Sequence, residues 1–491
     1  MPERILGIDL GTTNSVMAIL EGGQPHVIPT AEGRRLCPSV VGFTPSGELV
    51  VGDIAKRQLI THPQRTIASV KRFIGTRMKI TIDERTYAPP EISAMILHKL
   101  HRDAETYLGE QITKAVITVP AYFSDSQRQA TRDAGRIAGL DVLRIINEPT
   151  AAALAYGMDR NDNQTVLAWD LGGGTFDVSL LTIHEGTFRV ISTNGDTHLG
   201  GDDWDGHLMH HLVKLFRERE GIDLQDDRLA LQRLKEAAEE AKIRLSTEEE
   251  TVFSLPFLAS VEGQARHLEA KITRAEFEEL TADLRKRMVG PTVQAMKDAE
   301  LKPYELDGII LVGGSTRMPA IQAMVQSVLL SKPIVGVNPD EVVALGAAIQ
   351  GGIISGEITR MKLYDITPLS LGIETKGGVF TRIIPRNTPI PISASQTFTT
   401  AHDSQTSVEI HVLQGERDFA ANNKSLGRFT LKGIAPAARG KARIEVAFAL
   451  DANGIVQITA TDQATGARQQ VEVTASSGMT EEEIQTMIVE S

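Results

Sequence analysis

The sequence has a single cysteine, Cys37, and only 4% aromatic residues. One cysteine excludes an internal disulfide framework and a zinc site built from cysteines. This usage is typical of a reducing compartment, so we expect a cytoplasmic protein. Long apolar runs are missing as well: none approaches the roughly 18 residues that span a membrane. The N-terminal MPERILGIDL also lacks the apolar core of a signal peptide. We therefore expect no membrane partner.

Basic residues are fewer than acidic residues. Lys and Arg number 51 against 63 Asp and Glu, which gives a net charge of −12 over 491 residues. This balance argues against a nucleic-acid partner or an anionic membrane surface. A nucleotide is still compatible with it, because loops and helix N-termini can hold phosphates without a basic surface. The 41% hydrophobic content is too high for a disordered chain.

Short β-type runs alternate with helical patterns over the first two-thirds of the chain. This alternation predicts an α/β class. After about residue 356 the pattern changes to strand alternation with turn residues, which predicts a β-sandwich. Strands are expected at 5–8, 116–119, 166–169 and 309–312, and helices at 92–108, 202–216, 229–245 and 274–296.

The expected organisation has four parts. An α/β domain of two lobes covers residues 1–357, a linker 358–364, and a β-sandwich 365–478. In the last part, 479–491, Thr480 and Glu483 have the spacing of a capping box. We expect a helix there that the chain interrupts after about two turns. The turn Asp451–Gly454 is expected to join two strands of the sandwich.

The strongest internal signal is a repeat. Residues 8–15 (IDLGTTNS) are similar to 169–177 (WDLGGGTFD), and each run reads as a strand, a Gly/Thr turn and a second strand. Backbone N–H groups in such turns form anion-binding nests. Asp9 and Asp170 would end their strands at one gap, where two carboxylates suit Mg²⁺ held through waters. The expected phosphate donors are Gly11, Thr12, Thr13, Asn14, Gly172, Gly173, Gly174 and Thr175.

Either hairpin alone could be an ordinary β-turn, but the matched pair favours a phosphate site. No Gly-x-x-x-x-Gly-Lys-Ser/Thr loop is present. The other candidates have plain structural alternatives. Lys71 could be a solvated lysine, Glu148 the start of a helix capped by Asn147, and Asp177 a turn acid.

A helix face and a Gly turn complete the candidate set. Glu239, Lys242 and Ser246 share one helix face, which spacing alone would make a solvated face. The pair Glu240–Arg244 has ordinary i,i+4 spacing there. Residues 313–317 (GGSTR) follow a strand and precede a helix, where α/β folds receive nucleotides. Residues 338–341 (NPDE) read as a helix N-terminus with Pro339 as its first residue.

Four motifs in this order carry a resemblance to a known family. Residues 8–15, 117–123 (ITVPAYF), 170–177 and 310–317 (ILVGGSTR) resemble the seventy-kilodalton heat-shock chaperones, most closely the bacterial DnaK type. The resemblance runs from about residue 5 to 484. It includes 411–417 (HVLQGER) and 423–427 (NKSLG) in the β region.

The resemblance implies an actin-like ATPase, a linker and a peptide-binding β-sandwich. Its cofactors would be ATP or ADP with Mg²⁺. Its partners would be extended apolar peptides, a J-domain co-chaperone and a nucleotide exchange factor. By the same resemblance, Asp9, Asp170 and Glu148 would arrange hydrated Mg²⁺ and the attacking water. Lys71 would stabilise the γ-phosphoryl charge, and Thr175 would contact that phosphate and become self-phosphorylated.

The resemblance also assigns the remaining sites, and it reverses the solvated-face interpretation of Glu239. Asp177 is grouped with the catalytic residues. The residues implied to bind adenosine are Glu239, Lys242, Ser246, Gly313, Gly314, Ser315, Arg317 and Asp340. Those implied to relay nucleotide state are Pro120, Arg128, Leu363 and Asp365. Those implied to bind peptide are Ile373, Lys376, Phe398, Ala401, Val408 and Ile410.

Four departures from the family pattern stand out. The segment 77–89 is short, so a peripheral lobe would be trimmed. Lys362 replaces an apolar linker residue, which predicts weaker docking of the linker. Lys376 replaces an apolar residue of the peptide arch. The helical lid that follows the β domain in the family is expected to be missing.

Two other functions are possible on the same actin-like fold. One is a sugar or acetate kinase, which needs an aspartate poised for a substrate hydroxyl. The other is a filament-forming structural protein. Neither carries an appended β domain, so residues 365–473 argue against both.

Overall fold

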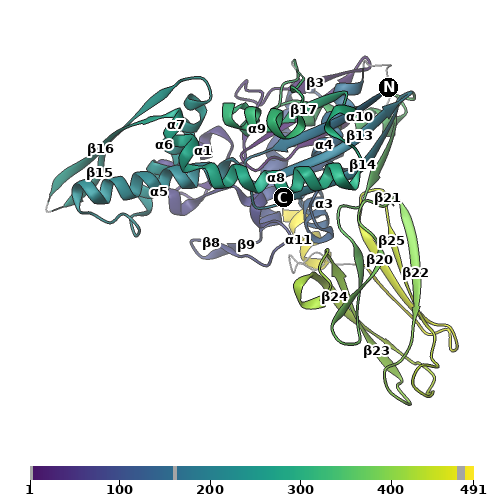
Figure 1. Cartoon of the computed structure of the whole chain (residues 1–491). Coiled ribbons are helices and arrows are strands. Elements are labelled where there is room, and N and C mark those ends of the chain that lie inside the picture. The colour runs from purple at the N-terminus through teal and green to yellow at the C-terminus, as the bar shows by residue number, and fades with distance from the viewer. Residues whose placement is uncertain (1–3, 159–162, 262, 335, 473–480, 491) are drawn as a thin grey trace.

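The computed structural model describes residues 4–158, 163–261, 263–334, 336–472 and 481–490 (Figure 1). The expected cap Thr480 and the last residues of the expected sandwich range, 473–478, lie outside the described residues. Among the described helices, none is long and apolar enough to cross a membrane.

The first sheet contains the N-terminal hairpin. Its strand order is β11-β10-β1-β2-β3, and β4 also pairs with β2. β1 is parallel to β10 and antiparallel to β2. Its core side is covered by α2 and α3, whose apolar residues join one buried cluster with Leu6 and Ile8. The bounds are β1 Ile5–Asp9, β2 Asn14–Glu21, β3 Gln24–Ile28, β4 Cys37–Pro38, β10 Lys114–Val119, β11 Asp141–Asn147, α2 Pro89–Leu108 and α3 Asp125–Ile137.

The second sheet repeats this arrangement around the second hairpin. Its order is β17-β12-β13-β14-β18-β21, with β12 antiparallel to β13 and parallel to β17. Trp169 and Phe176 pack tilted at 4.7 Å between ring centroids in its core. The bounds are β12 Gln164–Leu171, β13 Phe176–His184, β14 Thr187–Asp196, β17 Gly308–Val312, β18 Lys362–Ile366, β21 Pro389–Ile390, α5 Gly201–Glu220, α6 Arg228–Leu245 and α9 Pro319–Leu329.

Two helices lie between the sheets and bring them together. α4 (Glu148–Gly157) packs on β12, and α10 (Val342–Ser355) packs on β1, β2 and α4. Gly346 allows the two helices to approach, because a Cβ there would lie 1.8 Å from the carbonyl oxygen of Ala151. The buried cluster around these helices contains residues of both sheets. The edges that carry the two hairpins are therefore held facing each other.

A small sheet and two hairpins lie outside these two sheets. The strands β5, β6 and β7 form a small sheet beside α1, while β8–β9 and β15–β16 are two-stranded hairpins. Phe257 lies in the β15 bulge with φ of 53° and is exposed. The bounds are β5 Val40–Phe43, β6 Leu49–Val51, β7 Thr66–Ala68, α1 Asp53–Thr61, β8 Ile80–Ile82, β9 Arg85–Tyr87, β15 Glu250–Val261 and β16 Gln264–Thr273.

Two expected helices differ in the structure. The helix expected at 274–296 is divided at Thr281 into α7 (Arg274–Leu280) and α8 (Ala282–Asp298). The buried Thr281 hydroxyl donates to the Phe277 carbonyl at 2.8 Å, so it competes with the helical ladder there. Residues 338–341 form a turn, not a helix start, and α10 begins at Val342. Glu341 instead accepts two hydrogen bonds from Arg35, at 2.6 and 2.7 Å.

The C-terminal β domain has two four-stranded sheets. One has the order β20-β19-β23-β24 and the other β22-β25-β26-β27. Alternating residues of both sheets, including Ile410, Val446 and Phe448, fill a shared core. The Gly454 N–H donates to the Asp451 carbonyl at 3.1 Å in the turn between β25 and β26. The bounds are β19 Leu371–Thr375, β20 Val379–Ile384, β22 Ile392–Phe398, β23 Ser407–Gln414, β24 Lys424–Lys432, β25 Ile444–Leu450, β26 Val456–Asp462 and β27 Arg468–Glu472.

The segment between the two parts is a strand. β18 extends the second sheet, where Lys362, Leu363 and Tyr364 face Thr187–Arg189 of β14 in parallel register. β18 also pairs with β21, so the chain enters the β domain without leaving the sheet. The β domain projects away from the sheets, and α11 (Glu481–Glu490) lies against α3 (Figure 1).

Candidate functional site

A cavity of about 790 Å³ opens between the two sheets. Both hairpin turns contribute to its wall. Gly173 of one hairpin touches the other, since a Cβ there would lie 2.0 Å from Thr13 Oγ1. The predicted residues that line the cavity are Asp9, Gly11, Thr12, Thr13, Asn14, Lys71, Glu148, Asp170, Gly172, Gly173, Thr175, Glu239, Lys242, Ser246, Gly313, Gly314, Ser315, Arg317 and Asp340.

Two predicted residues lie just behind the wall. A Cβ at Gly174 would lie 2.9 Å from Thr12 Oγ1, so Gly174 packs between the hairpins. Asp177 is buried on β13, and its Oδ1 accepts the Tyr122 backbone N–H at 2.9 Å. Asp177 therefore anchors the segment that contains Pro120 and Tyr122.

One buried ion pair lies at the centre of the cavity. Lys71 is in the short 3₁₀ turn Val70–Phe73, and its Nζ is 2.5 Å from Glu148 Oε1. The interpretation of Lys71 as a solvated lysine is wrong, because Lys71 is only 4% exposed. The position of Glu148 follows from its place as the first residue of α4 directly after β11.

Three further carboxyl groups gather around this pair. Burial, together with the charge of Glu148, raises the pKa of Asp9 to about 7. The same two causes raise the pKa of Asp177 to about 7. Burial raises the pKa of Asp170 well above its usual value. Four carboxyl groups around the single ammonium of Lys71 make this end of the cavity a place for positive charge.

The donor set fits a hydrated Mg²⁺ ion better than a fully protein-ligated metal. Among the described residues, no three His, Cys, Asp or Glu side chains are grouped to hold a metal ion. Mg²⁺ keeps several waters and uses one or two carboxylates plus substrate phosphates. Asp9, the last residue of β1, and Asp170, the last but one of β12, are the two carboxylates placed beside the hairpin turns.

The other side of the cavity is formed by α6 and the 313–317 turn. Glu239, Lys242 and Ser246 line it as one helix face, and Lys242 Nζ is held 2.7 Å from Asp205 Oδ2. Arg317 is held 2.6 Å from Asp340 Oδ2. The Ser315 hydroxyl donates to the Gly172 carbonyl at 3.2 Å, which ties this turn to the second hairpin.

Sequence reasoning missed several lining residues. Ile243 is 61% exposed although it is apolar, and it contributes to the cavity wall. Arg244 lines the cavity too, while it also forms the expected pair with Glu240 at 2.8 Å. The available signal was their position on α6 next to Lys242. The remaining lining residues are Leu36, Thr247, Glu248, Val312, Met318, Gln322, Pro339 and Val343.

A buried hydrogen-bond chain connects the cavity with β18. Asn147, next to Glu148, holds the N-cap position of α4 but makes no side-chain cap bond. Its amide instead donates to both carboxylate oxygens of Asp365 at 2.9 Å. Arg128 donates to Asn147 Oδ1 at 2.6 Å and to the Ala121 carbonyl at 2.9 Å. The predicted N-cap position of Asn147 is confirmed, but its side chain makes no cap bond because it is used in this chain of bonds.

The candidate peptide residues lie in two environments. Ile373 and Ile410 are buried in the sandwich core, whereas Phe398 and Val408 are only partly buried against it. Lys376 and Ala401 are exposed in the turns 376–378 and 399–406. Lys362 is exposed on β18, and Leu363 packs on the cluster between the sheets. Lys362 therefore makes no apolar docking contact, and its expected weakening of docking loses its physical basis.

Together these features define an α/β protein that has a cavity between its two sheets and an attached β-sandwich. The model of the family described as "Hsp70 protein" matches residues 5–491. The chain therefore belongs to the Hsp70 family, whose members are ATP-dependent chaperones with ATPase activity. Binding of ATP or ADP, of unfolded peptides and of co-chaperones follows at the level of the family.

Proposed function

We propose that this chain hydrolyses ATP to ADP and phosphate in an actin-like, two-lobed domain of the DnaK type. Hydrolysis is coupled through β18 to the binding and release of extended apolar peptides. The observation that carries the proposal is the pair of facing hairpins with the Lys71–Glu148 ion pair between them. Phosphoryl transfer needs mainly positioning and charge stabilisation, and these groups supply both.

Each group has a distinct role in this proposal. The N–H groups and hydroxyls of the two turns bind the phosphates, and Lys71 stabilises charge that develops on the γ-phosphoryl group. Glu148 holds Lys71 in place and orients the attacking water. Asp177, behind the cavity wall, holds the Tyr122 backbone N–H and adds negative charge near Lys71. Bound Mg²⁺ would neutralise phosphate charge, held near Asp9 and Asp170 through waters.

The adenosine end of the proposed ligand lies against α6. Glu239, Lys242 and Ser246 offer polar groups, while the exposed face of Ile243 gives an apolar surface for a nucleobase. Arg317 and Asp340, which pair with each other, line the cavity as well. Thr175 lines the cavity, as the proposed self-phosphorylation requires.

Coupling is proposed to use the two hydrogen bonds between Asn147, the neighbour of Glu148 in sequence, and Asp365. A change at Glu148 reaches Asn147 directly, and Asn147 holds Asp365 at the end of β18. Loss of these bonds would free β18 and the β domain. A J-domain co-chaperone and a nucleotide exchange factor are the partners proposed to drive the cycle.

The proposal is tested by ATP turnover with and without an apolar heptapeptide. We expect the peptide to stimulate turnover. Val408→Phe should narrow the partly buried site at Val408 and abolish stimulation, while circular dichroism and basal turnover stay unchanged. Absence of turnover in the parent protein would refute the ATPase. Turnover without stimulation would refute the coupling.

A further inference from the structure

The end of the β domain that is remote from the ATPase part carries a concentration of unpaired positive charge. Three loops and one turn form this end: 375–379, 399–407, 432–443 and 462–468. They contain six basic and two acidic residues in a chain whose net charge is −12. We call this surface the basic end. Its basic residues, all exposed, are Lys376, Lys432, Arg439, Lys441, Arg443 and Arg468.

Backbone hydrogen bonds tie the loops of the basic end together. Ser404 N–H donates to the Ala437 carbonyl at 2.8 Å, and Ile434 N–H donates to the Thr406 carbonyl at 3.1 Å. Gln463 N–H donates to the Arg443 carbonyl at 2.9 Å, which joins the 462–468 turn to the same surface. The positive charges are therefore held on one framework.

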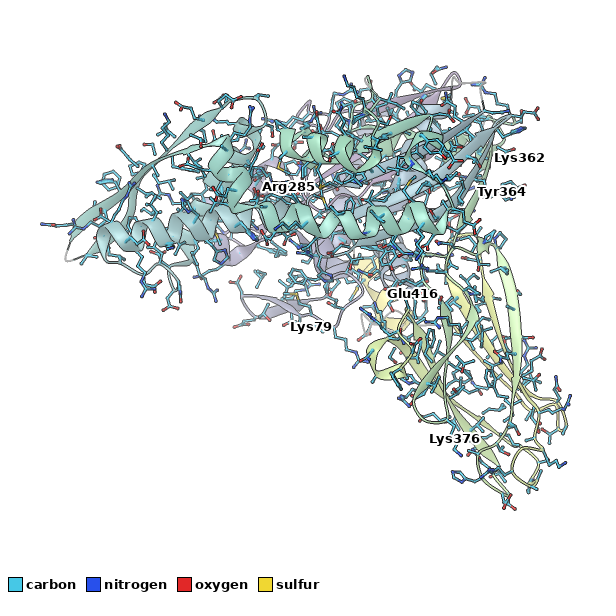
Figure 2. All side chains as sticks on the ribbon, viewed as in Figure 1. Lys79, Arg285, Lys362, Tyr364, Lys376 and Glu416 are labelled. Carbon is cyan, nitrogen blue, oxygen red and sulfur yellow. The ribbon has the colours of Figure 1, made fainter. Side chains whose placement is uncertain are left out.

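The turn with Lys376 reaches the same end. β19 is antiparallel to β23, with Ile373 facing Val412, so the turn that follows β19 lies toward the Val408 end of β23. Figure 2 labels Lys376 in the far part of the β domain, away from Lys362 and Tyr364. The partly buried Val408 is thus at the end of the domain that carries the basic loops.

The acidic groups near the basic end are already engaged. Asp462 is buried, and its carboxylate accepts the Thr465 hydroxyl at 2.8 Å. Asp403 Oδ1 accepts the Arg439 backbone N–H at 2.7 Å. Glu374 and Glu409 are paired with Arg428.

The ion pairs of the described β domain use other cations. They involve Arg382, Arg386, His411 and Arg428. Within the described part of the chain, none of the six basic side chains has a carboxylate within ion-pair distance. Unpaired positive charge around an apolar site is complementary to a ligand with acidic groups outside an apolar centre.

We propose that the β domain selects extended peptides whose apolar centre is flanked by aspartate or glutamate. The proposal rests on the proposed peptide-binding function and adds the substrate class. Val408 and its neighbours take the apolar centre, and the basic end attracts the acidic flanks. The attraction acts between exposed charges, so it is screened within about 8–10 Å at physiological salt.

Three labelled peptides test this, each with three central leucines. They are flanked on both sides by two aspartates, two serines or two lysines. Fluorescence anisotropy with the whole chain and ADP should order the affinities as aspartate, then serine, then lysine. The spread should shrink between 50 and 500 mM salt. Equal or tighter binding of the lysine peptide would overturn the proposal. If the serine peptide does not bind at all, the proposed peptide-binding function fails, and this proposal fails with it.

Matched charge-neutral variants locate the effect. Lys432→Gln combined with Lys441→Gln should weaken the aspartate peptide about 2- to 10-fold and leave the serine peptide unchanged, since exposed pairs contribute modestly. Lys286→Gln combined with Lys332→Gln removes the same charge from exposed sites of the ATPase part and should change neither peptide. Equal weakening by both double variants would show a general charge effect and overturn the assignment to the basic end.

Discussion

Lys71 Nζ lies 2.5 Å from Glu148 Oε1, and both side chains are less than a tenth exposed. Burying two such ions costs desolvation energy that their attraction repays only in part. The pair is therefore better explained as a device that fixes an ammonium group in the cavity than as a source of stability. That ammonium is surrounded by the carboxyl groups of Asp9, Asp170 and Asp177. Because these outnumber the single ammonium, the site can accept a further cation.

Lys71→Ala should lower single-turnover ATP hydrolysis by about 10²–10³-fold, because it removes a group aimed at developing charge. Nucleotide affinity should fall much less, since such a group acts more on the transition state than on the ground state. Lys79→Ala, at an exposed site labelled in Figure 2, is the matched control and should change neither value. Hydrolysis near the parent rate in Lys71→Ala would remove this residue from the mechanism.

Asp9→Asn and Asp170→Asn should each raise the Mg²⁺ concentration needed for half-maximal hydrolysis. Each change removes negative charge from the place that suits a hydrated cation. Asp203→Asn is a suitable control, because Asp203 pairs with Arg72 at 2.9 Å and is absent from the cavity lining. A metal titration that is unchanged in both cavity variants would mean that the hairpins are plain turns.

The contact between the two parts contains a buried titratable group. Asp125 Oδ1 accepts the Val456 backbone N–H at 2.8 Å, and its Oδ2 has no partner among the described residues. Burial raises the pKa of Asp125 to about 7, while that Val456 bond and the charges of Arg128 and Lys424 oppose the rise. Asp451 adds to the rise.

Separation of the two parts would expose Asp125 and return its pKa toward 3.8. The docked state then binds more protons between pH 4 and 7, so docking strengthens as the pH falls through 7. From pH 8 to pH 6 the docking constant should rise about tenfold. The docking constant is measured by fluorescence energy transfer between two dyes, one on each part, which reports how far the parts separate. Asp125→Asn should flatten this dependence, and an equal slope in both proteins would contradict the assignment.

Asp365→Ala should release β18 from the sheet, because it removes both acceptors of the Asn147 amide. Hydrogen exchange at residues 362–366 with ATP bound should become at least tenfold faster. Lys362→Leu, on the same strand, should leave this protection unchanged, since Lys362 is exposed. A gain of protection in Lys362→Leu would restore the expectation that this lysine weakens docking.

Many of the residues that line the cavity could be predicted from the sequence, because the patterns that mark them are local. The two hairpins each lie within about ten residues, and the face Glu239–Ser246 follows from helical spacing. Interactions between residues far apart in the chain could not be predicted from the sequence. Lys71 and Glu148 are 77 residues apart, and only the fold shows that they pair. Asp125 and Val456 are 331 residues apart, so a buried carboxyl group between the two parts could not be foreseen.

Other differences come from competition between neighbouring interactions. Asn147 has the right type and place for a helix cap, yet Arg128 and Asp365 take its side chain. Thr281 interrupts a stretch with continuous helical spacing, because its hydroxyl bonds back to Phe277. Residues 338–341 have the sequence of a helix N-terminus, but Arg35 binds Glu341 across 306 residues.

The most direct test of the coupling is the dissociation rate of a fluorescent apolar peptide after rapid mixing with ATP and Mg²⁺. The account predicts dissociation at least tenfold faster with ATP than with ADP, and loss of this difference in Asp365→Ala. Equal rates with ATP and ADP in the parent protein, with turnover intact, would contradict it. In that case the cavity and the β domain would work independently.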